Sequence, residues 1–289
     1  WTTHNEPWVV AFNGYGSGVH APGICDYSQA YQAVHHLLLS HGKALQVFRQ
    51  GGYEGQIGIV LNLSSFKPSS EHEAHVVASQ RVYDQHYGMF LDPIMLGEYP
   101  ERHLEWIGPH QPDLSAGDLE LIHQPLDFLG VNYYMTHLVS FEVGRGILKA
   151  TSQHYSAPGW GRTEMGWGIN PYGLTDVFMD VHTKTGGLDL YVTENGCAMV
   201  DKPDDSGFVE DWERIGFLRN HLHASHRAMT LGAKLRGYYV WSLLDNFEWA
   251  RGYEPRFGIV RVNYATGDRI PKQSANWYRQ VIQQNGFAL

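Results

Sequence analysis

The chain has 289 residues, 43% of them hydrophobic, so it is long enough to bury a sizeable core. Its formal net charge of −9, without any run of Lys or Arg, argues against nucleic acid and anionic membranes as partners. No apolar stretch approaches the roughly 18 residues that a membrane span needs. We therefore expect a globular protein with a small ligand.

Cysteine and histidine usage bears on compartment and on metal chemistry. Cys25 and Cys197 are too few for a disulfide framework and fit a reducing compartment, so we expect a cytoplasmic location. The 17 histidines include His221, His223 and His226, but this spacing does not place all three on one helix face. No HExxH or CxxC motif occurs, so we expect no metal and no cofactor.

Apolar runs and helical spacing alternate along the chain. The predicted strands, in chain order, are 1–5, 56–63, 127–134, 188–194 and 235–242. The predicted helices are 27–49, about 71–90, 118–123, 173–185, 211–230 and 271–284. This alternation predicts a parallel sheet with helices outside it.

Three stretches between or within these elements need interpretation. The glycine-rich segment 14–18 has no strand-turn-helix context, so we interpret it as an irregular surface loop rather than a phosphate-binding loop. The helix over 27–49 contains Gly42, where the sequence leaves open whether the helix is interrupted, and the helix over 71–90 should stop before Pro93. The long segment 135–167 reads as a functional or mobile loop.

Each predicted strand is apolar and ends in polar or aromatic residues. These strand-end residues are Glu6, Asn62, Asn132, Tyr134, Glu194 and Trp241. A (β/α)8 TIM barrel, an α/β fold, collects its chemistry from the carboxyl ends of several strands in this way. The alternative, an open doubly wound sheet, normally shows a phosphate-binding glycine turn, and none is convincing here.

The strand ends are spaced by about 60 residues per βα unit, so the chain supplies about five of the eight units of such a barrel. We therefore predict a single, partial TIM-barrel catalytic domain over 1–289. The missing strands would precede Thr2. The open edges of this barrel favour association, either with a separate N-terminal piece or with another copy of the chain.

Two carboxylates stand at strand ends that should face the same mouth. Glu6 follows the first strand and Glu194 ends the fourth. The smallest reaction that uses such a pair is glycoside hydrolysis, with retention at a carboxyl separation of about 5–5.5 Å and inversion at about 6.5–9.5 Å. The sequence leaves both outcomes open, and it leaves open a structural ion pair at Glu194.

Aromatic and polar residues near these carboxylates suit a sugar. Trp241, Trp249, Tyr134 and Trp160 offer flat apolar faces for pyranose rings, although core packing is the more common role of any single aromatic. Asn5 and Glu248 offer hydrogen-bond partners for hydroxyl groups.

Five multi-residue motifs resemble successive signatures of glycoside hydrolase family 1, the β-glucosidases. They are THNEPW at 3–8, GYG at 14–16 with HAPG at 20–23, DFLGVNYY at 127–134, YVTENG at 191–196 and WSLLDNFEWA at 241–250. They occur in the family's order and extend over essentially the whole chain. The resemblance implies the C-terminal portion of the family's barrel, covering strands 4 to 8.

The resemblance also implies roles for single residues. Glu6 would be the acid/base and Glu194 the nucleophile of a retaining β-glycosidase acting on β-glucosides or β-galactosides, such as aryl glycosides and cellobiose. The implied substrate-binding residues are Asn5 at the sugar 2-hydroxyl, Asn132 beside Glu6, Tyr134 on the nucleophile, Trp241 under the glycone, and Glu248 and Trp249 at the remote hydroxyls. Glu248 would repel a phosphosugar, so an unphosphorylated sugar is expected.

The chain departs from the family pattern in two places. The family's first three strands contribute a glutamine and a histidine to the glycone hydroxyls, and an arginine beside the nucleophile. The segment that would carry these three residues is absent from this sequence. Gly168 stands where the family usually has glutamate. The alternative to a working glycosidase is therefore a truncated, weakly active or non-catalytic carbohydrate-binding fragment that needs an N-terminal piece.

Overall fold

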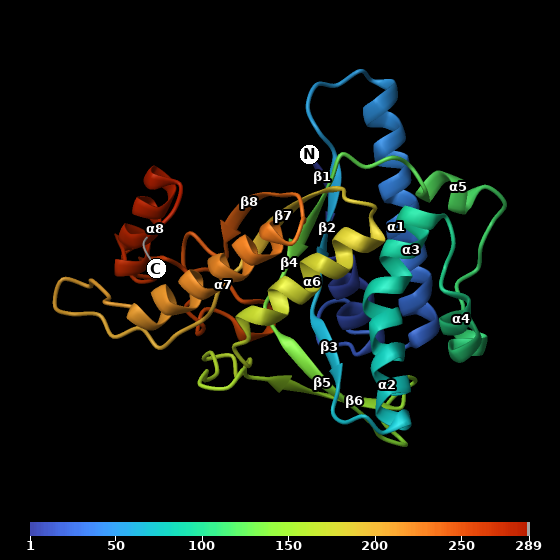
Figure 1. Ribbon diagram of the computed structural model, residues 1–289, viewed down its shortest axis with the longest axis horizontal. Helices are drawn as coiled ribbons and strands as arrows, with labels where there is room; N and C mark the ends of the chain where they lie inside the picture. Colours follow the sequence, from blue (N-terminus) through green and yellow to red (C-terminus); the bar gives the residue numbers. More distant parts are fainter. Residues whose placement is uncertain (288–289) are drawn as a thin grey trace.

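A curved, five-stranded parallel sheet forms the centre of the molecule, seen in a computed structural model that describes residues 1–287 (Figure 1). Its strand order is β1-β2-β4-β7-β8. The strands are β1 (Thr2–Asn5), β2 (Gly58–Asn62), β4 (Phe128–Asn132), β7 (Asp189–Asn195) and β8 (Leu235–Val240). Neighbouring strands follow one another in the sequence with helices between them, as in a (β/α)8 barrel. The prediction of a partial TIM barrel with about five βα units is confirmed.

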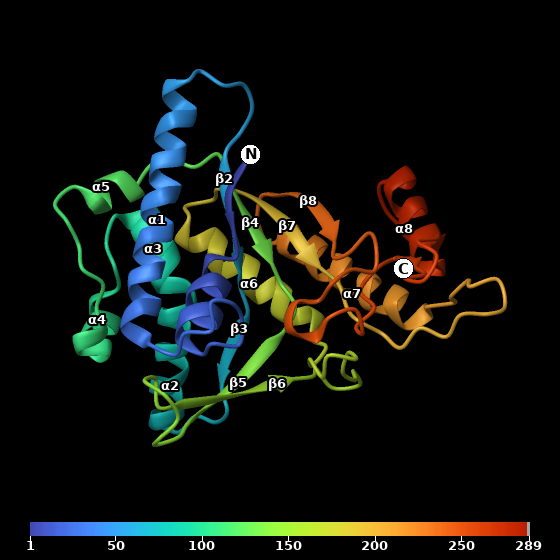
Figure 2. The ribbon, with the colours of Figure 1, turned by 180° about the vertical axis from the view of Figure 1, so that it is seen from behind.

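Strands β2 and β4 are buried because helices cover the outer face of the sheet, whereas the edge strands β1 and β8 are partly exposed. The α-helices are α1 (Tyr27–Gln50), α2 (Glu73–Tyr83), α3 (Met89–Leu96), α4 (Glu101–Ile107), α5 (Asp118–Ile122), α6 (Pro171–Lys184), α7 (Trp212–Thr230) and α8 (Gln273–Gln284). Figure 1 shows α6 and α7 in front of the strands, and Figure 2 shows β4 and β7 in front of α6. Ile59, Leu129 and Leu190 of the sheet are fully buried in a core shared with Tyr31 of α1 and Phe178 of α6.

Helix α1 is continuous through Gly42, so the interruption that the sequence left open does not occur. Asp26 caps its first turn by accepting hydrogen bonds from the backbone N–H groups of Ser28 (2.8 Å) and Gln29 (3.2 Å). A Cβ on Gly42 would lie 2.1 Å from the carbonyl oxygen of Leu121. The glycine therefore allows the α5 turn to pack closely against the helix, which offsets its lower helix propensity.

The glycine-rich segment is not an irregular surface loop, and this prediction is corrected. Residues Val9–Gly16 form the π-helix η1, in which Ala11 and Phe12 are buried. The Phe12 ring meets the Tyr31 ring of α1 edge-on at 5.2 Å between centroids. A Cβ on Gly16 would lie 3.6 Å from the side chain of Ala30, an ordinary van der Waals contact, so η1 packs closely against α1 at this position. Packing against α1 therefore decides the local structure.

The predicted helix over 71–90 is also corrected. It consists of α2, a π-helical turn η2 (Asp84–Gly88) and α3, which continues through Pro93 to Leu96. A proline removes one backbone donor and crowds the preceding turn. The wider turn of η2 lies directly before α3, and such turns are a common means of accommodating an irregular stretch within a helical segment.

The long segment 135–167 contains two strands that the sequence analysis missed. Strands β5 (Thr136–Phe141) and β6 (Ala150–Tyr155) join β3 (Ser65–Pro68) in a separate sheet of order β3-β5-β6. Their residues are mostly polar or half-exposed, so they lack an apolar pattern. Farther along, a Cβ on Gly168 would lie 2.5 Å from the Tyr155 carbonyl group, which accounts for glycine there.

The remaining short elements lie near the ends of the larger ones. They are η3 (Gly108–His110), η4 (Trp249–Arg251), β9 (Val260–Val262) and β10 (Arg269–Pro271). Within residues 1–287, no helix combines the length and apolar character that a membrane crossing requires. The same residues contain no group of three or more His, Cys, Asp or Glu side chains placed to hold a metal ion.

Candidate active site

Glu6 stands at the carboxyl end of β1 in a strained backbone conformation. Its φ angle of 51° lies in the left-handed region, which residues with a side chain rarely adopt. Its backbone N–H donates to the carbonyl oxygen of Val60 on β2 at 3.0 Å, so the turn is anchored to the sheet. Non-glycine residues held in this way are found mainly at functional sites.

Asn132, at the end of β4, connects the first carboxylate to its surroundings. Its Nδ2 donates to Glu6 Oε1 at 2.8 Å and to Asn5 Oδ1 at 3.0 Å. The hydroxyl group of Thr193 donates to Asn132 Oδ1 at 2.6 Å, which fixes the amide orientation. Asn132 is 1% exposed, so its polar atoms depend on these partners.

Glu194 is the next-to-last residue of β7 and receives a hydrogen bond from a tyrosine. The phenol of Tyr134 donates to Glu194 Oε2 at 2.7 Å. In the register of β4 and β7, Val131 pairs with Val192 and Asn132 pairs with Glu194, so Thr193 is the extra residue of an irregularity. This local bulge lets both Thr193 and Glu194 contact residues at the end of β4.

The three acidic side chains of the site influence one another. The pKa of Glu6 is raised to about 7, first by burial and then by the charges of Glu194 and Glu248, while the Asn132 hydrogen bond opposes the shift. Burial raises the pKa of Glu194, and its hydrogen bonds with Tyr134, Asn5 and Asn132 act in the opposite direction. Burial and the charge of Glu194 raise the pKa of Glu248. The site therefore favours proton retention, most clearly at Glu6.

The hydrogen bond between Tyr134 and Glu194 has a defined direction. Burial and the neighbouring carboxylates raise the pKa of Tyr134 well above its ordinary value, so the phenol stays protonated and donates. The ion pairs found in residues 1–287 do not include Glu194, so the alternative of a structural ion pair is not supported.

The loop after β8 carries the remaining predicted residues. The backbone N–H of Trp241 donates to the Asn195 carbonyl oxygen at 3.0 Å, so Trp241 begins next to β7. Glu248 lies within electrostatic reach of Glu6 and Glu194. Trp249 lies farther out: it is 65% exposed, and its ring stacks on His20 at 5.9 Å. Trp160 packs instead against a second core cluster around Cys197.

The structure brings together Asn5, Glu6, Asn132, Tyr134, Glu194 and Glu248, and it places Trp241 beside them and Trp249 at the periphery. The sequence analysis missed Thr193 and Asn195. Asn195 donates from Nδ2 to the Tyr133 carbonyl oxygen at 2.6 Å and accepts a hydrogen bond from the Tyr238 hydroxyl. The sequence signal that could have indicated Thr193 and Asn195 is that they directly flank Glu194.

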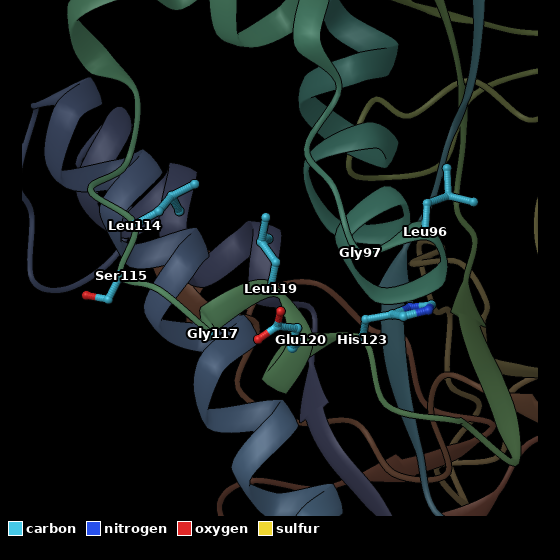
Figure 3. A pocket seen from close by; sticks show the side chains of 8 residues that line it. All are labelled: Leu96, Gly97, Leu114, Ser115, Gly117, Leu119, Glu120 and His123. Atoms are coloured by element: carbon cyan, nitrogen blue, oxygen red, sulfur yellow. The ribbon is translucent and has the colours of Figure 1, made fainter.

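Two hollows lie away from these carboxylates. The first, shown in Figure 3, lies between the end of α3 and α5, where it is lined by Leu96, Gly97, Leu119 and His123 among others. The chain enters β4 after α5, so this hollow lies toward the amino-terminal ends of the strands. The second is lined by residues of β1, α1 and the segment before β2. Neither includes Glu6 or Glu194.

The model of glycosyl hydrolase family 1 matches residues 1–287. The chain belongs to this family. β-Glucosidase A of Thermotoga maritima is 43% identical over 288 residues, which are 99% of this chain and 64% of that protein. β-Glucosidase A of Acetivibrio thermocellus is 42% identical, again over 99% of this chain and 64% of that protein.

Solved structures of family 1 agree with the fold. The family 1 β-glucosidase from Thermotoga maritima has a TM-score of 0.94 at 42% identity, covering 100% of this chain and 64% of that chain. A further structure of the Thermotoga maritima enzyme contains deoxynojirimycin and matches equally well, with a TM-score of 0.94. The predicted family is confirmed, and this chain spans about 64% of the length of these relatives.

Proposed function

We propose that this chain provides the catalytic carboxylates of a retaining β-glycosidase that hydrolyses β-glucosides or β-galactosides, including aryl glycosides and cellobiose. The supporting observation is the pairing of Glu6, with its pKa raised to about 7, with Glu194, which accepts from Tyr134 at 2.7 Å. We further propose that the chain corresponds to strands 4 to 8 of the family barrel and forms one catalytic domain over 1–289.

In the first step, a Glu194 carboxylate oxygen attacks the anomeric carbon from the face opposite the aglycone. The bond to the aglycone oxygen breaks, and its electron pair takes the proton that Glu6 carries. A raised pKa lets Glu6 hold this proton near neutral pH. The products are a glycosyl ester on Glu194 and the free alcohol.

In the second step, water replaces the ester. Once Glu194 is esterified, its charge no longer raises the pKa of Glu6, so Glu6 ionises more readily and accepts a proton from the attacking water. The ester bond breaks, and the carboxylate of Glu194 returns. Two inversions at the anomeric carbon give net retention.

The other predicted residues bind or position. Asn132 orients Glu6 through its 2.8 Å hydrogen bond, and Asn5 is available to the sugar 2-hydroxyl. Trp241 would form the floor of the glycone site. Glu248 and Trp249 would accept and donate hydrogen bonds at the remote hydroxyls, and the negative charge of Glu248 would disfavour a phosphosugar.

The test is hydrolysis of an aryl β-glucoside by this chain, with Glu6→Gln as the matched control. The proposal expects hydrolysis that exceeds the Glu6→Gln rate, and proton NMR should show the β-anomer as the first product. Equal rates for both proteins, together with sugar binding, would instead favour the carbohydrate-binding alternative. An α-anomer as the first product would overturn the retaining mechanism.

We also propose that the outer edges of β1 and β8 are covered in the working protein, by an N-terminal piece or by a second copy of the chain. In residues 1–287 each of these strands pairs on one side only, and Trp1 and Tyr239 are 76% and 59% exposed. Exposed parallel edges promote association. Light scattering of the native particle tests this, since a monomer without a second component would contradict it. The cytoplasmic location stays a prediction, and Cys25 and Cys197 are free thiols.

A further inference from the structure

Three cationic side chains and three carboxylates form ion pairs with one another between the loops that follow β7 and β8. These six residues, the ion-pair cluster, are Asp201, Asp211, Arg214, Asp245, Arg256 and Lys272. The side chains of Lys272 and Asp245 have no exposed surface, and that of Arg214 is 1% exposed. Charges are seldom buried to this degree unless each is matched, and here the two signs balance.

Asp245 closes the loop that follows β8. Its Oδ1 accepts from the backbone N–H of Gly258 at 3.0 Å and from Lys272 Nζ at 3.1 Å. Its Oδ2 accepts from Arg256 Nη1 at 3.0 Å and from the Val262 N–H at 3.2 Å. Asp245 stands three positions before Glu248, so these bonds fix the base of the loop that carries Glu248.

Arg214 of α7 holds the loop that follows β7. Its guanidinium donates to the Cys197 carbonyl oxygen at 3.4 Å, and Cys197 stands three positions after Glu194. It also donates to Asp201 at 3.2 Å and to Asp211. A further bond, at 2.8 Å, reaches the Arg256 carbonyl oxygen in the other loop.

Lys272 joins the two loops directly. Its ammonium group is paired with Asp201 after β7 and with Asp245 after β8. Burial lowers the pKa of Lys272, and the two carboxylates oppose this shift. The backbone of Lys272 is itself fixed, because its N–H donates to the Ile259 carbonyl oxygen at 2.9 Å. The buried ammonium group of Lys272 therefore sets the distance between the loop that follows β7 and the loop that follows β8, which carries Glu248.

We propose that Lys272 and Arg214 are positioning residues that, through the ion-pair cluster, hold Glu248 at the distance from Glu194 that a glycone hydroxyl requires. The glycone contact rests on the proposed function. The connection between the two loops does not rest on it, because the ion pairs and hydrogen bonds of the cluster alone define that connection. The two parts can therefore be tested separately.

Amide hydrogen exchange tests the connection without any turnover. Lys272→Met is compared with Lys202→Met, which removes the same charge from an exposed position beside Asp201. We expect Lys272→Met to raise exchange about tenfold in 196–201 and 242–262 while β2 and β4 keep their protection. Lys202→Met should leave the whole pattern unchanged. Unchanged exchange in both loops, or an equal rise throughout the chain, would overturn the positioning role.

Substrate discrimination tests the consequence for Glu248. The ratio of kcat/KM for an aryl β-glucoside to that for its 6-deoxy analogue does not depend on the fraction of folded protein. Lys272→Met should lower this ratio toward that of Glu248→Ala, by about tenfold, because a charged hydrogen-bond partner is displaced. The double variant Lys272→Met/Asp201→Asn removes one carboxylate together with the cation, so the charges of the cluster balance again. It should recover stability but keep the low ratio.

The outcomes separate the two proposals. A wild-type ratio in Lys272→Met, in a protein that hydrolyses the glucoside, would overturn the glycone part while leaving the proposed function standing. Absence of hydrolysis by the wild-type protein would count against the proposed function, and the exchange experiment would still decide whether the ion-pair cluster connects the loops.

Discussion

Two groups of carboxyl side chains lie near the same end of the sheet, and they differ in their counter-charges. Within residues 1–287, Glu6 and Glu194 have uncharged partners, Asn132 and Tyr134, and take part in none of the ion pairs. The carboxylates of the ion-pair cluster are instead matched by Lys272, Arg214 and Arg256.

The difference fits the chemistry proposed for the first group and a supporting role for the second. A carboxyl that is buried beside another carboxyl and without a cation keeps its proton to higher pH, as the pKa of about 7 for Glu6 indicates. A carboxylate held by cations and backbone N–H groups, such as Asp245, is fixed in position. Within residues 1–287, the placement of cations therefore separates the proposed reactive pair from the ion-pair cluster.

The largest effect is expected at the nucleophile. Glu194→Ala should lower the turnover of an aryl β-glucoside by at least about a thousandfold, because the covalent step is lost. Azide should partly restore the rate by occupying the vacated space, and the product should be the α-glycosyl azide. Formation of the β-azide would contradict the role of Glu194.

Removing a charge from the ion-pair cluster should destabilise the protein. Asp245→Asn should lower the free energy of unfolding by roughly 3–5 kcal/mol, because Lys272 would be left buried with an incomplete set of partners. Asp205→Asn, at an exposed position in the same part of the chain, is the control. Urea denaturation at neutral pH measures the free energy of unfolding of both variants. Equal values for Asp245→Asn and Asp205→Asn would contradict the stabilising role of the cluster charges.

Removing a charge from the catalytic pair should have the opposite sign. The pKa of Glu6 is raised from 4.5 to about 7, so burial disfavours its ionised form in the folded state. Protonated Glu6 therefore contributes fully to the free energy of unfolding below pH 4.5. This contribution is lost between pH 4.5 and 7, where Glu6 ionises in the unfolded chain but not yet in the folded one. Glu6→Gln should therefore match the wild type at pH 4 and exceed its unfolding free energy by about 3 kcal/mol at pH 8.

Urea unfolding at the two pH values measures this difference. The control is Glu213→Gln, an exposed glutamate in the first turn of α7. A Glu6→Gln stability that tracks the wild type from pH 4 to pH 8 would show that Glu6 ionises as it does in the unfolded chain.

The smallest effect is the pH dependence of catalysis. kcat/KM should fall about tenfold per pH unit above pH 7, because the free enzyme then loses the Glu6 proton. A substrate whose leaving group needs no protonation, such as a dinitrophenyl β-glucoside, should lose this alkaline limb. An alkaline limb that is the same for both substrates would contradict the assignment of Glu6 as the acid.

The strands that carry the candidate site were predicted better than the connecting structure. Glu6 and Glu194 stand in short local motifs at the ends of apolar strands, and a parallel barrel brings such ends together. Polar strands such as β5 carry no apolar alternation, and the glycine-rich η1 forms because it packs on α1. Neither property is visible in a local pattern.

The ion-pair cluster was beyond sequence reasoning for a different reason. Asp201 and Lys272 pair although 71 positions separate them, and isolated charges in loops usually indicate solvent exposure. The bulge that directs Thr193 and Glu194 toward the end of β4 depends on the register between two strands. The ion pair and the bulge are therefore visible only in the folded structure.

The central claim is that Glu194 forms a covalent bond to sugar while Glu6 serves as the acid/base. The most direct measurement is peptide mass mapping after incubation with a dinitrophenyl 2-deoxy-2-fluoro-β-glucoside. The fluorine slows both steps, and the activated leaving group restores the first, so the ester should accumulate. We expect a single added fluorosugar on the peptide that contains Glu194. Labelling of Glu6, or no label in a protein that hydrolyses the parent glucoside, would contradict the account.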